Sequence, residues 1–339
     1  MRAVVMRNKQ LVLDEVADPV PEQGEILVRT LACGICGSDL HALKHIEKMV
    51  AAARDGGAPF VLDPGRDVVM GHEYCAEVLD LGPDTPAAVK PGDRVVSMPI
   101  SFRGGFQGIG YSNEVPGGYG ERMVLPALTA LQVPNGLPTE HAALTEPMAV
   151  GLHAVNKARM DSSDAALVIG CGPVGLAVIA ALRLKGLRPI VAADYSPMRR
   201  QLAERIGADA VVDPAAQRPV AAFEHAAGGR SAVIFECVGV PGILDQLMRE
   251  APRGGRIVVV GVCMEDDRIR PMIGINKELA MQFVLGYTPD EFAETLLALA
   301  DGRIAVAPLI TGRVSLDGVA AAFEALAQPD AHAKILVEP

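Results

Sequence analysis

Long apolar runs are missing from this sequence of 339 residues. A membrane-spanning helix needs roughly 20 consecutive apolar residues, and the longest apolar stretch, residues 165–184, is broken by three glycines and a proline. The first ten residues return to charge after a few apolar ones, so they lack the apolar core of a signal peptide. We therefore expect no membrane association and a cytoplasmic location.

Cysteine and positive charge are also scarce. Six cysteines spread over the chain are too few for a disulfide scaffold, so we expect free thiols or metal ligands. The formal net charge is -10, which opposes binding to a phosphate backbone, because such binding depends on many Lys and Arg contacts. We therefore expect no nucleic-acid partner.

The chain is nevertheless rich in material for a folded core, since 50% of its residues are hydrophobic. Its length exceeds what one core usually organises, which favours two compact units. Up to about residue 134, short β-type runs alternate with turn residues, which is typical of an irregular, mostly antiparallel domain. From residue 165, apolar strands alternate with helices, which predicts a doubly wound parallel sheet.

The end of the chain fits neither block alone. We expect helices near residues 290–301 and 316–327, and we expect this part to return to the first domain. The predicted fold is therefore α/β, with a mainly antiparallel β catalytic domain over residues 1–152 and 288–339. A parallel-sheet, nucleotide-binding domain is predicted over residues 153–287.

A glycine-rich motif between a strand and a helix predicts the nucleotide site. It consists of Gly170, Cys171, Gly172, Pro173, Val174 and Gly175. Glycines at these positions allow a tight turn, close approach of a pyrophosphate and close helix packing. Asp194 ends the next strand, where a carboxylate accepts hydrogen bonds from the adenosine ribose and repels a 2′-phosphate. The motif predicts NAD, although Arg199 and Arg200 leave NADP open.

A second group of polar residues begins with Cys33, Cys36, Ser38, Asp39 and His41, and continues with Gly71-His72-Glu73 and Thr145-Glu146-Pro147. With the blocks GEILVRTLACGICGSDLH, VVMGHE, KPGDRVV, GGYGERMVL and TEPMAVGLHA, the sequence resembles the zinc-containing medium-chain dehydrogenases. This is the family of alcohol and sorbitol dehydrogenases. The resemblance covers nearly the whole chain and implies a GroES-like catalytic domain and a Rossmann domain.

The resemblance implies one catalytic zinc, held by Cys36, His72 and an acidic ligand. Thiolate and imidazole are good zinc donors, and a catalytic site needs only three protein ligands. Both Glu73 and Glu146 stand at family positions near the metal. We favour Glu146 as the resting ligand, directly or through water, with Glu73 as an alternating or supporting group.

Ser38 and His41 match the family's proton relay, which carries the alcohol proton through the nicotinamide ribose to the surface. Such a relay needs a hydroxyl that can donate and accept, and an acceptor that titrates near neutrality. His45, one helical turn later, is the alternative acceptor, and His41 is otherwise a surface histidine. Cys33 is interpreted as a packing residue, with thiol redox chemistry of the Cys33–Cys36 pair as the alternative.

Two stretches depart from the family pattern. Many members hold a second zinc with four cysteines after the KPGDRVV block, but no cysteine lies between Cys75 and Cys171, and a glycine-rich loop over residues 101–118 stands there instead. A helix is expected in the stretch between His41 and Gly71, where it would cover one wall of the cleft. Four aromatic residues are candidates for the other wall or for packing of the loop: Phe102, Phe106, Tyr111 and Tyr119.

Neither stretch has a cluster of Arg or Lys suited to an anionic substrate. The sequence therefore predicts a zinc-dependent, NAD-linked dehydrogenase of a neutral secondary alcohol, diol or polyol, acting in either direction. The alternatives are a zinc-free quinone or enone reductase of the same fold and a non-catalytic NAD-binding protein. A small-molecule substrate and a homodimer or homotetramer complete the expectation.

Overall fold

The computed structural model describes residues 1–58, 62–328 and 330–339, and the chain divides into two compact units. Unit 1 consists of Met1–Glu146, Phe292–Ala300 and Ile310–Pro339, and unit 2 consists of Pro147–Glu291 and Asp301–Leu309. These bounds differ from the predicted division into 1–152 with 288–339 and 153–287. Two of the four boundaries fall within continuous helices, α3 (Thr145–Ala158) and α9 (Pro289–Ala300), where no loop or change of composition marks them in the sequence. The other two lie after Ala300 and after Leu309.

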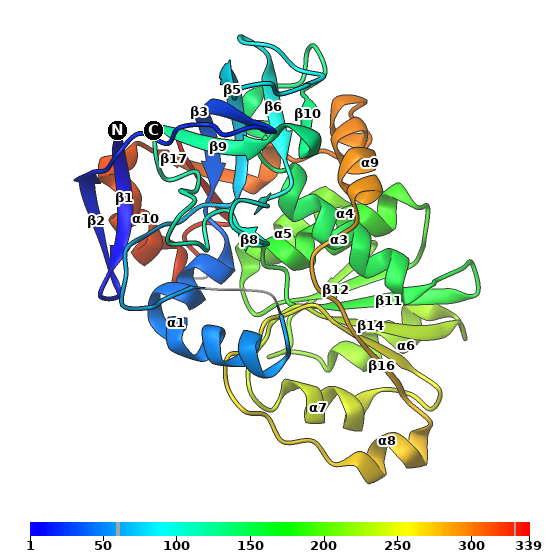
Figure 1. Cartoon of the computed structure of the whole chain (residues 1–339). Helices are drawn as coiled ribbons and strands as arrows, with labels where there is room; N and C mark the ends of the chain where they lie inside the picture. The colour runs from blue at the N-terminus through cyan, green and yellow to red at the C-terminus, as the bar shows by residue number, and fades with distance from the viewer. Residues whose placement is uncertain (59–61, 329) are drawn as a thin grey trace. The chain divides into compact units, whose positions relative to one another are not determined.

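A mainly antiparallel sheet forms the centre of unit 1 (Figure 1). Its strands are β3 (Glu25–Gly34), β5 (Glu73–Leu81), β6 (Arg94–Ser97), β9 (Arg122–Pro126), β10 (Ala130–Gln132), β17 (Ile310–Val314) and β18 (Lys334–Val337). The strand order is β10-β6-β5-β3-β18-β17, and β9 also pairs with β3. The β17–β18 pair is parallel, whereas the other pairs are antiparallel.

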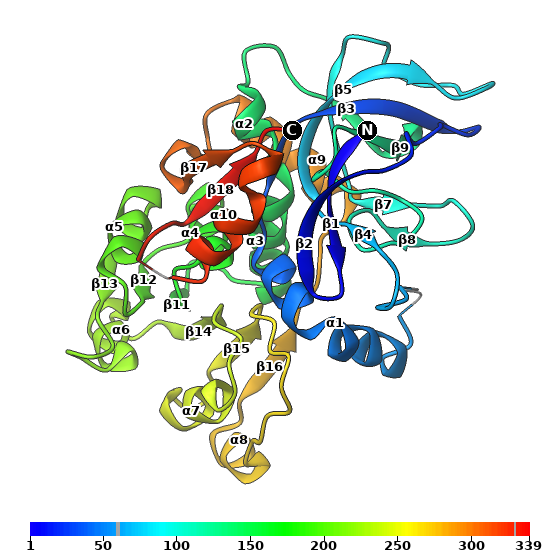
Figure 2. The same cartoon turned by 90° about the vertical axis from the view of Figure 1, so that its left-hand side faces the viewer.

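Smaller elements complete unit 1. A second sheet has the order β2-β1-β4, and β7 pairs with β8 (Figure 2). These strands are β1 (Arg2–Arg7), β2 (Gln10–Glu15), β4 (Val68–Val69), β7 (Ile100–Ser101) and β8 (Gln107–Gly108). The helices are α1 (Gly37–Asp55), α2 (Thr139–Ala142) and α10 (Val319–Leu326), with 3-10 turns η1 (Ala127–Thr129) and η3 (Leu316–Gly318).

The helix predicted between His41 and Gly71 is α1, which begins earlier than predicted, at Gly37, and its start is built around Cys36. The Cys36 amide donates to Asp39 Oδ2 at 3.0 Å, so the Asp39 carboxylate caps a free N–H group at the start of the helix. His45 has φ -133°, which kinks the helix one turn after His41. The local sequence thus fixes Cys36 at the junction between β3 and α1.

Six parallel strands form the sheet of unit 2, in the order β13-β12-β11-β14-β15-β16. They are β11 (Asp164–Ile169), β12 (Ile190–Ala193), β13 (Ala210–Val212), β14 (Ser231–Glu236), β15 (Arg256–Val259) and β16 (Ala280–Phe283). The connecting helices are α4 (Pro173–Leu184), α5 (Pro197–Ile206), α6 (Pro219–Ala227), α7 (Ile243–Glu250) and α8 (Pro271–Lys277), and η2 (Ala307–Leu309) contacts α5. The predicted fold class is confirmed.

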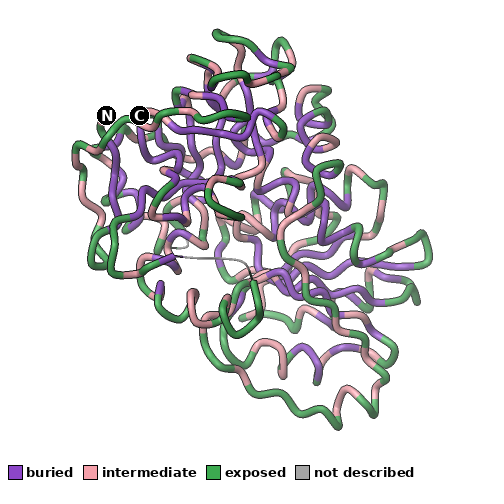
Figure 3. The backbone as a smooth tube through the Cα atoms, viewed as in Figure 1, coloured by how far each residue is buried: buried purple, intermediate pink, exposed green. Residues whose placement is uncertain are grey.

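Buried residues are concentrated in the interior of each unit (Figure 3), whereas strands β2 and β16 have no buried residue. Every residue of β11 is buried, as expected for a central parallel strand with both faces covered. In unit 1, Ile26 and Val28 of β3 pack with Tyr119 in one apolar core. Among the described residues, no helix combines the length and the hydropathy that a membrane span requires.

Candidate active site

Pairing of β3 with β5 brings the first candidate ligands together. Gly34, at the end of β3, lies opposite Glu73, the first residue of β5. Cys36 follows two residues later, so it lies beside His72. One ligand atom each from Cys36, His72 and Glu73 lies within 4.8 Å of the others, which is compatible with one shared metal ion.

The first glycine of the CGICG block, Gly34, lies so close to the Glu73 side chain that no larger residue fits there. A Cβ atom at this position would collide with the Glu73 carboxylate. The same carboxylate is completely buried, and Lys334 of β18 provides its counter-ion. Lys334 Nζ lies 2.7 Å from Glu73 Oε1 and 2.6 Å from Oε2, and it donates to Ile35 O at 3.0 Å.

Lys334 was missed by the sequence analysis. In the sequence, Lys334 is a lysine directly before the apolar run ILV of β18. A lysine at such a position is normally expected to be exposed, so the sequence pattern did not indicate its burial. Burial lowers the pKa of Lys334, but the charges of Glu73, Cys36 and Glu146 outweigh burial and hold this pKa above its usual value. The lysine is therefore a cation in the interior of unit 1.

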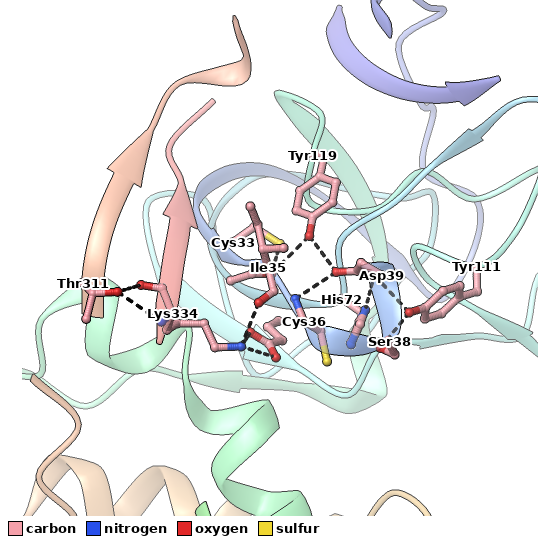
Figure 4. Close-up of polar contacts among 12 residues, drawn as sticks. Cys33, Ile35, Cys36, Ser38, Asp39, His72, Tyr111, Tyr119, Thr311 and Lys334 are labelled. Carbon is pink, nitrogen blue, oxygen red and sulfur yellow. Dashed lines mark hydrogen bonds and ion pairs between the residues drawn. The ribbon is translucent and has the colours of Figure 1, made fainter. Parts of the chain in front are cut away.

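Asp39 lies at the centre of a hydrogen-bond network behind His72 (Figure 4). His72 Nδ1 is 3.3 Å from Asp39 Oδ1, and Tyr119 donates to Asp39 Oδ2 at 2.6 Å. The Tyr111 hydroxyl is 3.0 Å from Asp39 Oδ1 and 2.8 Å from Ser38 Oγ. Tyr111 and Tyr119 are therefore parts of the site, whereas Phe102 and Phe106 are exposed and pack edge to face on each other.

Burial and charge act against each other throughout this network. Burial raises the pKa of Asp39, but His72 and the hydrogen bonds from Tyr119 and the Cys36 amide outweigh it, so the pKa lies below its usual value. Burial lowers the pKa of His72, but Asp39 and Cys36 raise it well above its usual value. A buried cluster this rich in negative groups favours a bound cation.

The structure places the remaining predicted residues of unit 1 around this cluster. Glu146, in the first turn of α3, is half-buried and lies outside the group of three ligand atoms, although its charge acts on Lys334 and Tyr74. His41 is half-buried on α1, and burial, His45 and Lys44 lower its pKa.

Cys33 is completely buried in the same region. Burial, Asp39 and Glu73 raise its pKa well above the usual value. A thiol in this state is a poor nucleophile, which favours the packing interpretation over thiol redox chemistry.

The nucleotide motif of unit 2 lies where its sequence pattern predicts, between β11 and α4. Gly170 has φ +90°, and a Cβ atom at Gly175 would collide with the Gly170 carbonyl. Asp194, directly after β12, accepts from the Cys171 amide at 2.7 Å and from the Ser196 amide at 2.8 Å. The carboxylate is thus held against the glycine-rich turn at the start of α4.

The two arginines after Asp194 differ in their contacts. Arg200 donates to the carbonyl oxygens of Asp194 and Tyr195 at 2.7 and 2.8 Å, and it forms an ion pair with Asp213 at 3.2 Å. Arg199 Nη1 lies 4.0 Å from Asp194 Oδ2. Arg200 is thus engaged in holding the turn, whereas Arg199 stays beside the nucleotide motif.

The donor atoms of unit 1 fit a zinc ion. Thiolate, imidazole and carboxylate form a common donor set of catalytic zinc. Asp39 faces one ring nitrogen of His72 and leaves the other for the metal, which is the usual support of a metal-binding histidine. The glycine-rich turn before α4 fits a pyrophosphate, because the first N–H groups of α4 have no side-chain cap and can bind an anion.

Comparisons with known proteins agree with this arrangement. The alcohol dehydrogenase GroES-like domain matches residues 22–135, and the zinc-binding dehydrogenase family matches residues 173–301. The (R,R)-butanediol dehydrogenase of Bacillus subtilis is 33% identical over 100% of both chains. The erythritol/L-threitol dehydrogenase of Mycolicibacterium smegmatis is 33% identical over 79% of this chain and 78% of its own.

Solved structures show the same similarity. The crystal structure of 2R,3R-butanediol dehydrogenase from Bacillus subtilis has a TM-score of 0.85 at 32% identity, covering 100% of this chain and 99% of that one. A dehydrogenase of the zinc-binding type from Sinorhizobium meliloti, bound to NADP, has a TM-score of 0.84 at 28% identity with the same coverage. The chain therefore belongs to the zinc-containing medium-chain alcohol dehydrogenase family, whose members are oxidoreductases that act on alcohols with zinc and a nicotinamide cofactor.

Proposed function

We propose that this enzyme oxidises a neutral secondary alcohol, diol or polyol with NAD, or catalyses the reverse reduction. The observation that carries the proposal is the convergence of Cys36, His72 and Glu73. The relatives named for butanediol and for erythritol act on neutral compounds with more than one hydroxyl group, which supports a diol or polyol for this chain.

We propose that Cys36, His72 and Glu146 hold the zinc ion at rest. Both oxygens of Glu73 contact Lys334, so Glu73 would not be a ligand at rest and would be the carboxylate that can exchange onto a bound metal. One thiolate and one carboxylate leave the centre near neutrality, which preserves its strength as a Lewis acid. The chemistry supplied by the ion when bound is polarisation of the substrate oxygen, which lowers the pKa of an alcohol.

The protein groups around this centre move and hold protons. Ser38 accepts the proton of the substrate hydroxyl, and His41 receives it nearer the surface through the ribose of the cofactor. The lowered pKa of His41 keeps its imidazole neutral at pH 7, so it can accept a proton. Asp39 orients His72 through its Nδ1 side and stays ionised.

NAD is the proposed cofactor because of Asp194. Its carboxylate is fixed at the end of β12 by two backbone amides, where it favours ribose hydroxyls and opposes a 2′-phosphate. Arg200 is held by carbonyl oxygens and Asp213, which makes it a structural residue of the turn. Arg199 beside Asp194 is the group that would soften the preference for NAD.

A homodimer or homotetramer in the cytoplasm completes the proposal. Strand β16 stands at one end of the strand order of its sheet, and exposed apolar residues gather in and near it: Met272, Ile275, Phe283 and Leu285. Such an edge favours pairing with another chain. The free state of all six cysteines agrees with a reducing compartment.

A panel of alcohols tests the proposal. Purified enzyme is incubated with NAD or NADP and with (R,R)- and (S,S)-2,3-butanediol, sorbitol, erythritol and ethanol, and NADH or NADPH absorbance is followed. We expect turnover with NAD and a diol or polyol, one zinc per chain by elemental analysis, and loss of turnover after chelation. Full activity in metal-free protein would favour the zinc-free reductase, and absence of any turnover would favour the non-catalytic NAD-binding protein.

A further inference from the structure

Lys334, the first residue of β18, lies beside the junction between β3 and α1 that carries Cys36 (Figure 4). The pairing of β18 with β3 places it there, because the Ile35 amide donates to Ile335 O at 3.0 Å. Only 3% of the Lys334 side chain is exposed. What this lysine does is therefore set by the groups that its ammonium contacts inside unit 1.

The N–H groups of this ammonium all have partners. Lys334 Nζ donates to Glu73 Oε1 at 2.7 Å, to Glu73 Oε2 at 2.6 Å and to Ile35 O at 3.0 Å. Because an ammonium has three donors and no acceptor, these contacts use its full hydrogen-bonding capacity. Two of them hold the same carboxylate, and the third ties this carboxylate to the backbone residue before Cys36.

The Glu73 carboxylate nevertheless lies within reach of the metal site. One of its oxygens lies within 4.8 Å of the ligand atoms of Cys36 and His72. On the side of β3 the carboxylate is confined, because a Cβ atom at Gly34 would collide with it. Glu73 therefore lies between two positions for a cation, the ammonium of Lys334 and the metal site.

The charges of the proposed site balance when Glu73 stays with Lys334. The Cys36 thiolate and the Glu146 carboxylate together neutralise a divalent ion, and Lys334 neutralises Glu73. If Glu73 joined the ion as well, the ion would have three anionic ligands and would polarise a substrate oxygen less strongly. The ammonium would also lose its partner in the protein interior, where an unpaired charge is strongly destabilising.

We propose that Lys334 is a positioning residue that withholds Glu73 from the resting metal site and so leaves Glu146 as the acidic ligand. This inference rests on the proposed function and gives Lys334 the choice between the two glutamates. Removal of the ammonium should move Glu73 onto the ion, because a buried carboxylate needs a cation. Metal binding should then become tighter, whereas the loss of a merely structural lysine would loosen the site and weaken metal binding.

Cobalt(II) replaces zinc in the test, because its visible spectrum reports the number and type of its ligands without substrate or cofactor. Metal-free, full-length protein is titrated with cobalt chloride, and competition with a chelator gives the dissociation constant. In Lys334→Met we expect weaker and shifted d–d bands, the mark of an added ligand. The cobalt dissociation constant should fall by about tenfold or more, the size of one charge-assisted contact.

The double variant Lys334→Met with Glu73→Gln is the matched control, since it removes the cation and the carboxylate together. Its cobalt spectrum and dissociation constant should return toward those of the wild type, because the carboxylate through which Lys334 acts is gone. Lys90→Met, at an exposed lysine, should leave both unchanged.

Two variants that keep Lys334 test the same point if Lys334→Met does not fold. Glu73→Gln should leave the cobalt spectrum unchanged, because Glu73 is withheld from the ion. Glu146→Gln should change the spectrum and weaken cobalt binding, because it removes the resting ligand.

An unchanged spectrum or weaker cobalt binding in Lys334→Met would overturn the inference, as would a changed spectrum in Glu73→Gln. Failure of the proposed function is seen separately. Absence of turnover in the alcohol panel leaves these spectra unaffected, whereas a wild type that binds no cobalt would overturn the zinc site itself, and the role of Lys334 with it.

Discussion

The ion pair between Lys334 and Glu73 makes the sharpest prediction about stability. Lys334→Met keeps the length of the aliphatic chain and removes the cation, which leaves a completely buried carboxylate without its counter-ion. Two unit charges at the observed separation attract each other by about 6 kcal/mol at an effective dielectric constant of about 20. Part of this attraction is offset because the lysine no longer has to be desolvated, so we expect a loss of about 3–5 kcal/mol.

Urea unfolding followed by circular dichroism measures this loss in zinc-free and zinc-loaded protein. The loss should be smaller with zinc, because Glu73 can then place its charge on the metal. Lys90→Met, at an exposed lysine, is the control and should change the unfolding free energy by less than about 0.5 kcal/mol. Lys334→Met with Glu73→Gln removes both charges and should recover at least half of the loss.

The double variant is also the decisive comparison. If it is no more stable than Lys334→Met alone, the unpaired carboxylate is not the cause of the loss. A Lys334→Met protein as stable as the Lys90→Met control would refute the reasoning entirely, because the buried cation would then contribute nothing to the fold.

Three further variants test the catalytic assignments. His41→Gln should slow alcohol oxidation most on the acid side of neutrality. The pKa of His41 lies below its usual value of 6.5, so the imidazole is still largely neutral, and able to accept a proton, at a pH of about 6.5. A pH–rate profile unchanged from the wild type would remove His41 from the relay and favour His45 or direct transfer to solvent. Asp194→Gly should narrow the preference for NAD over NADP in kcat/KM, since it removes the repulsion against a 2′-phosphate; a wild type that prefers NADP contradicts the assignment. Cys36→Ser should lose most of its zinc by elemental analysis while its far-ultraviolet circular dichroism stays close to that of the wild type, because a neutral hydroxyl replaces a thiolate ligand. Two zinc ions per wild-type chain would show that a second site exists.

The nucleotide-binding half was predictable from the sequence because its signals are local. The motif from Gly170 to Gly175 needs only a strand before it and a helix after it, and both are encoded by short apolar patterns. The order of the family blocks along the chain likewise indicates Cys36, His72 and the two glutamates as candidate ligands.

Only the tertiary structure decided which groups face these candidates. Lys334 lies 261 residues from Glu73 in sequence, and Tyr111 lies 73 residues from Ser38. A lysine beside an apolar run and a tyrosine in a glycine-rich loop have no period or spacing that announces a partner. Their roles arise where β18 pairs with β3 and where the loop packs on Gly71, because buried charges and hydroxyls must find partners that only the folded chain supplies.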